Sequence, residues 1–116
     1  MNFDKDRRSF PRANYPCKIV LSTGSGKKVF YLHTENISAG GIRVILAEKL
    51  EIGQVVDIEL FAEIIPIKCQ GKVIWSVDIK PINGDKTLLF DVGIEFVDIA
   101  EDDQQRLKKL VESLLK

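Results

Sequence analysis

IKCQGKVIWSV, residues 67–77, alternates apolar and polar side chains along nearly its whole length. One face of this segment carries Ile67, Cys69, Gly71, Val73, Trp75 and Val77. The other face carries mostly lysine, glutamine and serine. A period of two indicates a β-strand with one face turned toward a core. We therefore interpret residues 67–77 as a long strand.

The same alternation recurs on both sides of this strand. Three earlier segments and one later segment show it: Tyr15–Leu21, Ile42–Leu46, Val56–Leu60 and Leu88–Phe96. The turn at Gly24-Ser25-Gly26 predicts a further strand near Lys28–Glu35. Asn83-Gly84, before the last segment, is a strong signal for a two-residue hairpin turn. Six strands joined by short turns predict an all-β domain, built as a small antiparallel barrel or sandwich.

The C-terminal segment has a different period. Its apolar residues recur at helical spacing: Leu107, Leu110, Val111, Leu114 and Leu115. Asp98 and Glu101 have the spacing of a capping box, which predicts a helix over residues 98–116. We expect the apolar stripe to pack on the strands, with partner binding through the exposed side as the alternative.

Composition limits the function classes. The chain has 116 residues, 45% of them hydrophobic, and its net charge is zero, so one soluble domain is expected and any anion site must be local. No apolar stretch reaches the roughly 20 residues that span a bilayer, and the N-terminus lacks a secretory apolar core, which favours the cytoplasm. Cys17 and Cys69 lie on apolar faces, which predicts buried thiols.

Catalytic and metal-binding chemistry find little support in the sequence. His33 is the only histidine and lies within a predicted strand, so no metal site of usual composition can be assembled. Neither a Walker loop nor a dinucleotide-binding glycine motif is present. We therefore expect a protein that is not an enzyme and has no cofactor.

An arginine cluster lies at the end of an N-terminal arm, residues 1–13. Arg7-Arg8-Ser9-Phe10-Pro11-Arg12 places three guanidinium groups within six residues. Such groups bind phosphate through paired donors and stack on purine faces. A short basic arm can also be a solvated tail.

A glycine-rich turn follows the predicted second strand. In Asn36-Ile37-Ser38-Ala39-Gly40-Gly41 the two glycines let backbone N–H groups converge and a ligand come close. An ordinary strand connection, in which Asn36 and Ser38 bond their own backbone, is the alternative.

Together, these two segments resemble the motifs of the PilZ domain family, the receptors for the bacterial second messenger cyclic di-GMP. Arg8 and Arg12 form RxxxR, and the residues from Asn36 to Gly41 form NxSxxG. Gly71–Trp75 and Val92–Phe96 also resemble strands of the family. The resemblance implies a six-stranded antiparallel β-barrel with a C-terminal α-helix.

The resemblance also implies roles for individual residues. Arg8 and Arg12 would clasp phosphates and stack on guanine, while Asn36 and Ser38 would contact the guanine edge or a phosphate. Gly40 and Gly41 would let the ligand approach. Arg7, which directly precedes the motif, implies binding of two stacked ligand molecules.

The expected organisation is a flexible arm over residues 1–13, a barrel over 14–97 and a packed helix over 98–116. The protein would be a stand-alone cyclic di-GMP receptor that signals to an unidentified protein, without binding nucleic acid or inserting into a membrane. Two alternatives stay open: a protein-interaction module that uses the barrel without the nucleotide, and a barrel that binds single-stranded nucleic acid.

Overall fold

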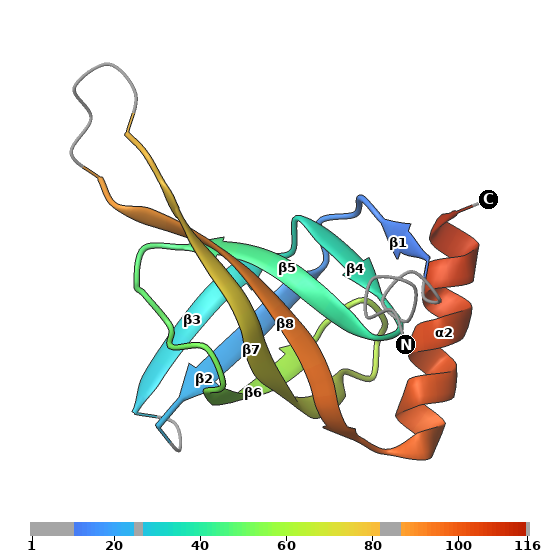
Figure 1. Ribbon diagram of the computed structural model, residues 1–116. Coiled ribbons are helices and arrows are strands. Elements are labelled where there is room, and N and C mark those ends of the chain that lie inside the picture. The colour runs from blue at the N-terminus through green and yellow to red at the C-terminus, as the bar shows by residue number, and fades with distance from the viewer. Residues whose placement is uncertain (1–10, 25–26, 82–86, 116) are drawn as a thin grey trace, which may run out of the picture.

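A computed structural model of the chain describes residues 11–24, 27–81 and 87–115. These residues form an antiparallel β-sheet followed by one helix (Figure 1). The strands are β1 (Arg12–Ala13), β2 (Lys18–Thr23), β3 (Lys28–His33), β4 (Asn36–Ser38), β5 (Gly41–Leu46), β6 (Val55–Leu60), β7 (Ile67–Ile79) and β8 (Leu89–Ile99), and the helix is α2 (Glu101–Leu114).

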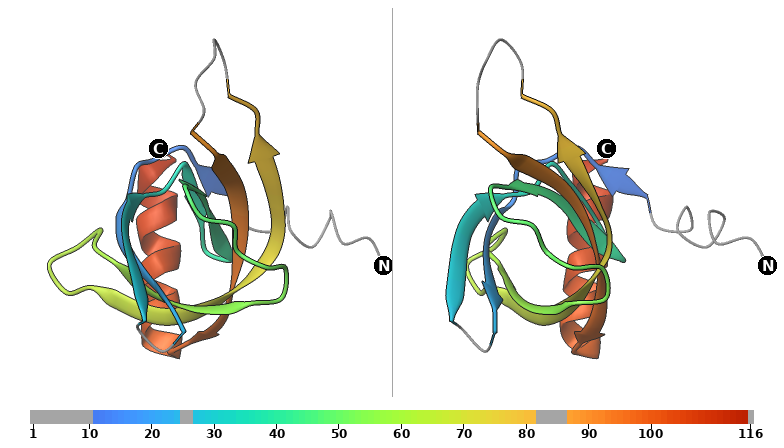
Figure 2. Two further views of the ribbon diagram at one scale, coloured as in Figure 1. Left: turned by 90° about the vertical axis from the view of Figure 1, so that its left-hand side faces the viewer. Right: turned by 60° about the vertical axis from the view of Figure 1, so that its left-hand side comes forward.

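The predicted fold class is confirmed: the described chain is all-β and antiparallel, with a C-terminal helix. The predicted strand count is wrong, since the described residues form a sheet of eight strands in the order β1-β4-β5-β8-β7-β6-β2-β3. The sheet curls strongly (Figure 2), but within the described ranges no strand pairing joins β3 back to β1. An ion pair of 2.6 Å between Lys28 Nζ and Glu48 Oε1 instead links β3 to the segment after β5.

The two additional strands, β1 and β4, have two and three residues. Segments this short have no alternation that a sequence pattern can reveal. They pair with each other, Arg12 opposite Ser38 and Ala13 opposite Ile37. Ala13 is buried, so the sheet begins inside the segment expected to be a flexible arm. The Asn83-Gly84 turn lies outside the described residues, although β7 and β8 pair as an antiparallel hairpin.

The core lies inside the curled sheet and is aliphatic. Its fully buried side chains include Ile19, Leu21, Ile37, Ile42, Val44, Ile58, Leu60, Val73 and Ile94. Burial of such side chains is worth about 1.5–3 kcal/mol each, and this burial holds the strands in register. The alternation predicted for residues 67–77 holds as far as Val73. A register shift follows between Val73 and Trp75, and Val77, which was predicted on the core face, is 57% exposed.

Two glycines let β7 and β8 pack closely against their neighbours. A Cβ on Gly93 would lie 2.1 Å from the indole Nε1 of Trp75, its cross-strand partner. A Cβ on Gly71 would lie 2.4 Å from Ile94 Cγ2. Close packing thus explains why glycine occupies positions 71 and 93 in the two segments that resemble strands of the family.

Helix α2 packs on the sheet through the predicted stripe, with Leu107 and Val111 buried in the core. The predicted capping box is wrong. Asp98 belongs to β8, opposite Gln70, and the residue before the helix is Ala100, which makes no side-chain capping bond. Three acidic residues in the first turn, Glu101, Asp102 and Asp103, complement the positive end of the helix dipole instead.

Both cysteines are buried and free, as predicted. Burial, with smaller contributions from Asp103 and Asp98, raises the pKa of Cys69 from its usual 9.0 to about 12. The unfolded chain therefore loses this proton at lower pH than the folded chain, so the thiol's contribution to stability falls as the pH rises above 9.0.

We expect the free energy of unfolding to fall by about 1 kcal/mol more in the unaltered protein than in Cys69→Val between neutral pH and about pH 10. The isosteric valine removes the titrating group and leaves lysines and tyrosines unchanged. Urea unfolding at the two pH values measures the difference. Equal losses of stability in both proteins would contradict the assignment of the shift to Cys69.

Candidate functional site

The arginine segment and the glycine-rich turn meet at the sheet edge formed by β1 and β4. The Arg12 guanidinium donates from Nη1 to Oδ1 of Asn36 at 2.7 Å. Arg12 stands opposite Ser38, and Asn36 lies two residues further along β4 on the same face. Figure 1 shows both short strands beside α2. The fold thus joins two residues that are 24 positions apart in sequence.

Ser38 shapes the turn that follows β4. Its side chain is buried, and its Oγ accepts hydrogen bonds from the backbone N–H groups of Gly40 and Gly41, both at 3.1 Å. The hydroxyl donates to the Gly41 carbonyl at 3.3 Å. For Ser38, therefore, the structure shows the ordinary strand connection. A direct contact between its hydroxyl and a ligand stays a prediction.

The two glycines of the turn serve the pairing of β5 with β8. A Cβ on Gly41 would lie 2.2 Å from the carbonyl oxygen of Ile94, which is backbone and cannot rotate away. The Gly40 carbonyl accepts from Phe96 N at 2.9 Å. Close packing thus explains Gly41 without a ligand, and the approach of a ligand to Gly40 and Gly41 stays a prediction.

A third polar residue, Arg43, faces Asn36 across the β4–β5 pair. Arg43 binds Asp91 through two parallel hydrogen bonds, Nε to Oδ1 at 2.8 Å and Nη2 to Oδ2 at 2.7 Å. The hydrogen bond to Asp91 is the main cause that raises the pKa of Arg43 above its usual value. Sequence reasoning missed this residue, since a single arginine in an alternating strand carries no motif.

The electrostatics of the site follow from these pairings. The carboxylate of Asp91 neutralises Arg43, while the exposed guanidinium of Arg12 donates to the neutral amide of Asn36. A guanidinium beside an amide offers planar donors together with a group that can bond a base edge. This arrangement suits a planar anion such as a nucleotide.

The structure describes five of the seven predicted site residues. Arg12 lies on β1, Asn36 and Ser38 lie on β4, Gly40 lies in the turn between β4 and β5, and Gly41 is the first residue of β5. Arg7 and Arg8 lie outside the described residues.

Residues 11–24, 27–81 and 87–115 contain no group of three histidine, cysteine or acidic side chains that could hold a metal ion. No helix among them is long and apolar enough to cross a membrane.

Comparison with known proteins gives one family match. A family model for the PilZ domain matches residues 6–113. No curated protein sequence matches the chain.

Solved structures share the fold. The PilZ domain of YcgR from Escherichia coli, solved with c-di-GMP, superposes with a TM-score of 0.73 at 18% identity, covering 94% of this chain and 92% of that one. The Bacillus subtilis inhibitor of motility MotI/DgrA gives 0.71 at 22% identity, over 92% of this chain and 50% of that one. The K. pneumonia MrkH–c-di-GMP complex gives 0.70 at 21%, over 94% and 52%. The chain thus spans about half the length of MotI and of MrkH.

Proposed function

The chain belongs to the PilZ domain family, and from that premise we propose that it is a receptor for cyclic di-GMP. The observation that carries the proposal is the 2.7 Å contact between Arg12 and Asn36. It joins one residue from each half of the RxxxR and NxSxxG pair at one edge of the sheet. Two structural neighbours add support, since YcgR and MrkH were solved with this ligand.

The proposed binding mode assigns each group a task. Arg8 and Arg12 hold the phosphates through charge-assisted bonds and stack on guanine. The Asn36 amide bonds the guanine edge while its oxygen orients Arg12. Ser38 acts through the shape of its turn, and Gly40 and Gly41 leave room for the ligand. Binding fixes the arm over residues 1–13, anchored by the β1–β4 pair, and the ordered arm signals to a partner protein.

We also propose that the protein binds the dinucleotide without cleaving it and works in the cytoplasm. The thiols of Cys17 and Cys69 are buried, and burial raises the pKa of both, so neither is an effective nucleophile. Two free cysteines also suit a reducing compartment. Chromatography of the ligand after incubation should return it intact, whereas cleavage by the pure protein would show an enzyme.

Calorimetric titration of the full chain with cyclic di-GMP tests the proposal. We expect saturable binding with two ligand molecules per chain, because Arg7 adds a third guanidinium that can stack on a second, intercalated molecule. GMP is the matched control, since it has a guanine and a phosphate but lacks the cyclic pair, and it should bind far more weakly. Saturation at one ligand would refute the role of Arg7, and absence of binding would refute the receptor proposal.

The absence of nucleic-acid binding requires its own test. MrkH is described as a c-di-GMP-dependent transcription regulatory factor. Titration with a duplex and with a single-stranded oligonucleotide, each with and without cyclic di-GMP, separates a receptor that acts on proteins from one that acts on DNA. We expect no binding of either, because the chain has no net positive charge.

A further inference from the structure

A second surface lies away from Arg12 and Asn36, at the end of β6. It consists of a protruding loop and a neighbouring groove. The loop between β6 and β7, which we call the isoleucine knob, has Glu63, Ile64 and Ile65 at its tip. It extends from the body of the protein in Figure 2. Ile64 is 101% exposed and Ile65 is 68% exposed. Adjacent apolar side chains this exposed mark interaction surfaces.

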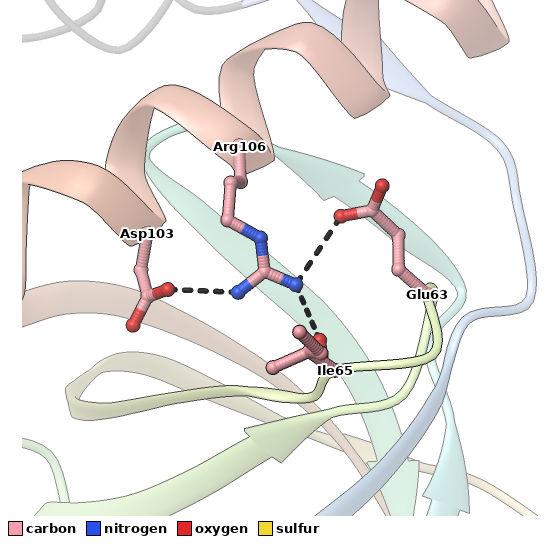
Figure 3. Close-up of polar contacts among 4 residues, drawn as sticks. All are labelled: Glu63, Ile65, Asp103 and Arg106. Atoms are coloured by element: carbon pink, nitrogen blue, oxygen red, sulfur yellow. Dashed lines mark hydrogen bonds and ion pairs between the residues drawn. The ribbon is translucent and has the colours of Figure 1, made fainter.

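The knob is held in place by helix α2. Arg106 donates from Nη1 to Asp103 on its own helix at 2.9 Å and from Nη2 to Glu63 Oε1 at 3.4 Å (Figure 3). The same Nη2 also donates to the backbone carbonyl of Ile65. One guanidinium therefore fixes both ends of the tip. Arg106 thus holds the loop in a conformation that exposes Ile64 and Ile65 to solvent. A loop that is ordered before binding loses less conformational entropy when it binds a partner.

The groove begins where the knob begins. Phe61, the first residue after β6, forms part of its wall and donates its N–H to the Lys18 carbonyl at 2.8 Å. The groove has a volume of about 330 Å³ and is lined by Lys18, Ile19, Val20, Tyr31, Leu32, His33 and Phe61. Its lining is largely apolar, and Tyr31 is 80% exposed at its side. A groove of this volume can admit aliphatic side chains.

The isoleucine knob and the groove carry opposite charges. The knob carries Glu63, whose side chain is 49% exposed despite its long contact with Arg106. The groove carries Lys18, which is exposed and makes no ion pair with any residue in the described ranges. The carboxylate of Glu63 beside the apolar knob is thus complementary in charge to the ammonium group of Lys18 beside the apolar groove.

We propose that this surface joins two copies of the chain in a two-fold symmetric dimer. Each copy inserts Ile64 and Ile65 into the groove of the other, and Glu63 of each copy meets Lys18 of the other. A two-fold interface must be self-complementary, and a knob beside a groove with opposite charges satisfies this condition on one chain. The dimer does not use the nucleotide site, so the inference goes beyond the receptor function.

Sedimentation velocity of the full chain from micromolar to millimolar concentration tests the proposal. We expect a monomer–dimer equilibrium. Ile64→Asp should raise the dissociation constant at least about 100-fold, because each substitution occurs twice in a two-fold symmetric interface. The matched control is Ile52→Asp, since Ile52 is 68% exposed, like Ile65, but lies at the opposite end of β6. Both variants replace exposed side chains and should keep the thermal midpoint of the unaltered protein.

A charge exchange identifies the partner groups. Lys18→Glu and Glu63→Lys should each weaken the dimer at least about tenfold, and the double variant should recover most of the loss. Three outcomes overturn the proposal: a monomer at all concentrations, growth into larger species, and a dimer that Ile52→Asp weakens as much as Ile64→Asp.

Discussion

Replacement of Arg12 by alanine is expected to weaken cyclic di-GMP binding at least about 30-fold, or about 2 kcal/mol. The guanidinium is exposed and is already oriented by Asn36 at 2.7 Å. Loss of charge-assisted bonds to a phosphate, together with loss of the planar surface for guanine, accounts for the magnitude. Calorimetric titration of the variant and the unaltered protein measures the effect.

Two control variants separate the possible causes of this loss. Arg12→Lys keeps the charge but removes the paired donors and the plane, so it should recover only part of the affinity. Lys49→Ala removes one positive charge from an exposed position outside the site and should leave the affinity within about twofold, because exposed charges are screened. The site assignment fails if Arg12→Ala binds like Lys49→Ala.

The contact between Arg12 and Asn36 can be examined in the same titrations. Asn36→Ala should cost less affinity than Arg12→Ala, because Arg12 keeps its charge. The double variant should lose less than the sum of the two single losses, since residues that act through one contact are not additive. The stability of all three variants should change by less than about 1 kcal/mol, because the contact is exposed.

Alternation predicted the long strands well and the short strands not at all. Residues 67–73 repeat the pattern often enough to show which face is buried, whereas the rest of β7 no longer alternates in burial. Arg12–Ala13 and Asn36–Ser38 are defined by pairing with each other, and a sequence does not show which distant segments will pair. The capping box at Asp98 was predicted wrongly for a related reason: β8 continues to Ile99, so the position is taken by the sheet.

The sequence likewise predicted some features of the candidate site and missed others. The motif spacing identified Arg12 and Asn36, and the structure brings their side chains together. Nothing in the sequence showed that Arg43 would neutralise Asp91 beside them, because that pair depends on the register of β5 and β8. The motif also marked Ser38 and Gly41, but their contacts are those of a turn and a strand pair. One sequence motif therefore combines residues that can bind a ligand with residues that shape the backbone.

Because Gly41 shapes the backbone, we expect Gly41→Ala to cause the largest loss of stability among the variants considered. The added methyl group would lie 2.2 Å from the Ile94 carbonyl oxygen and 3.2 Å from Glu95 Cα. Both atoms are backbone of β8, so relief requires β5 and β8 to separate. We expect the free energy of unfolding to fall by at least about 3 kcal/mol, which is a large part of the stability of a domain this size. Urea unfolding of the ligand-free protein measures it.

Gly53→Ala is the matched control for this change. Gly53 has a φ of +93°, which disfavours alanine, but no atom lies within 4 Å of its added Cβ. This variant measures the conformational cost alone, about 1–2 kcal/mol. Gly41 lacks a positive φ, so any larger loss there comes from the contact with Ile94. If Gly41→Ala is instead as stable as the unaltered protein and loses only its affinity for cyclic di-GMP, then Gly41 serves the ligand, as its place in the motif implies, and the packing explanation is wrong.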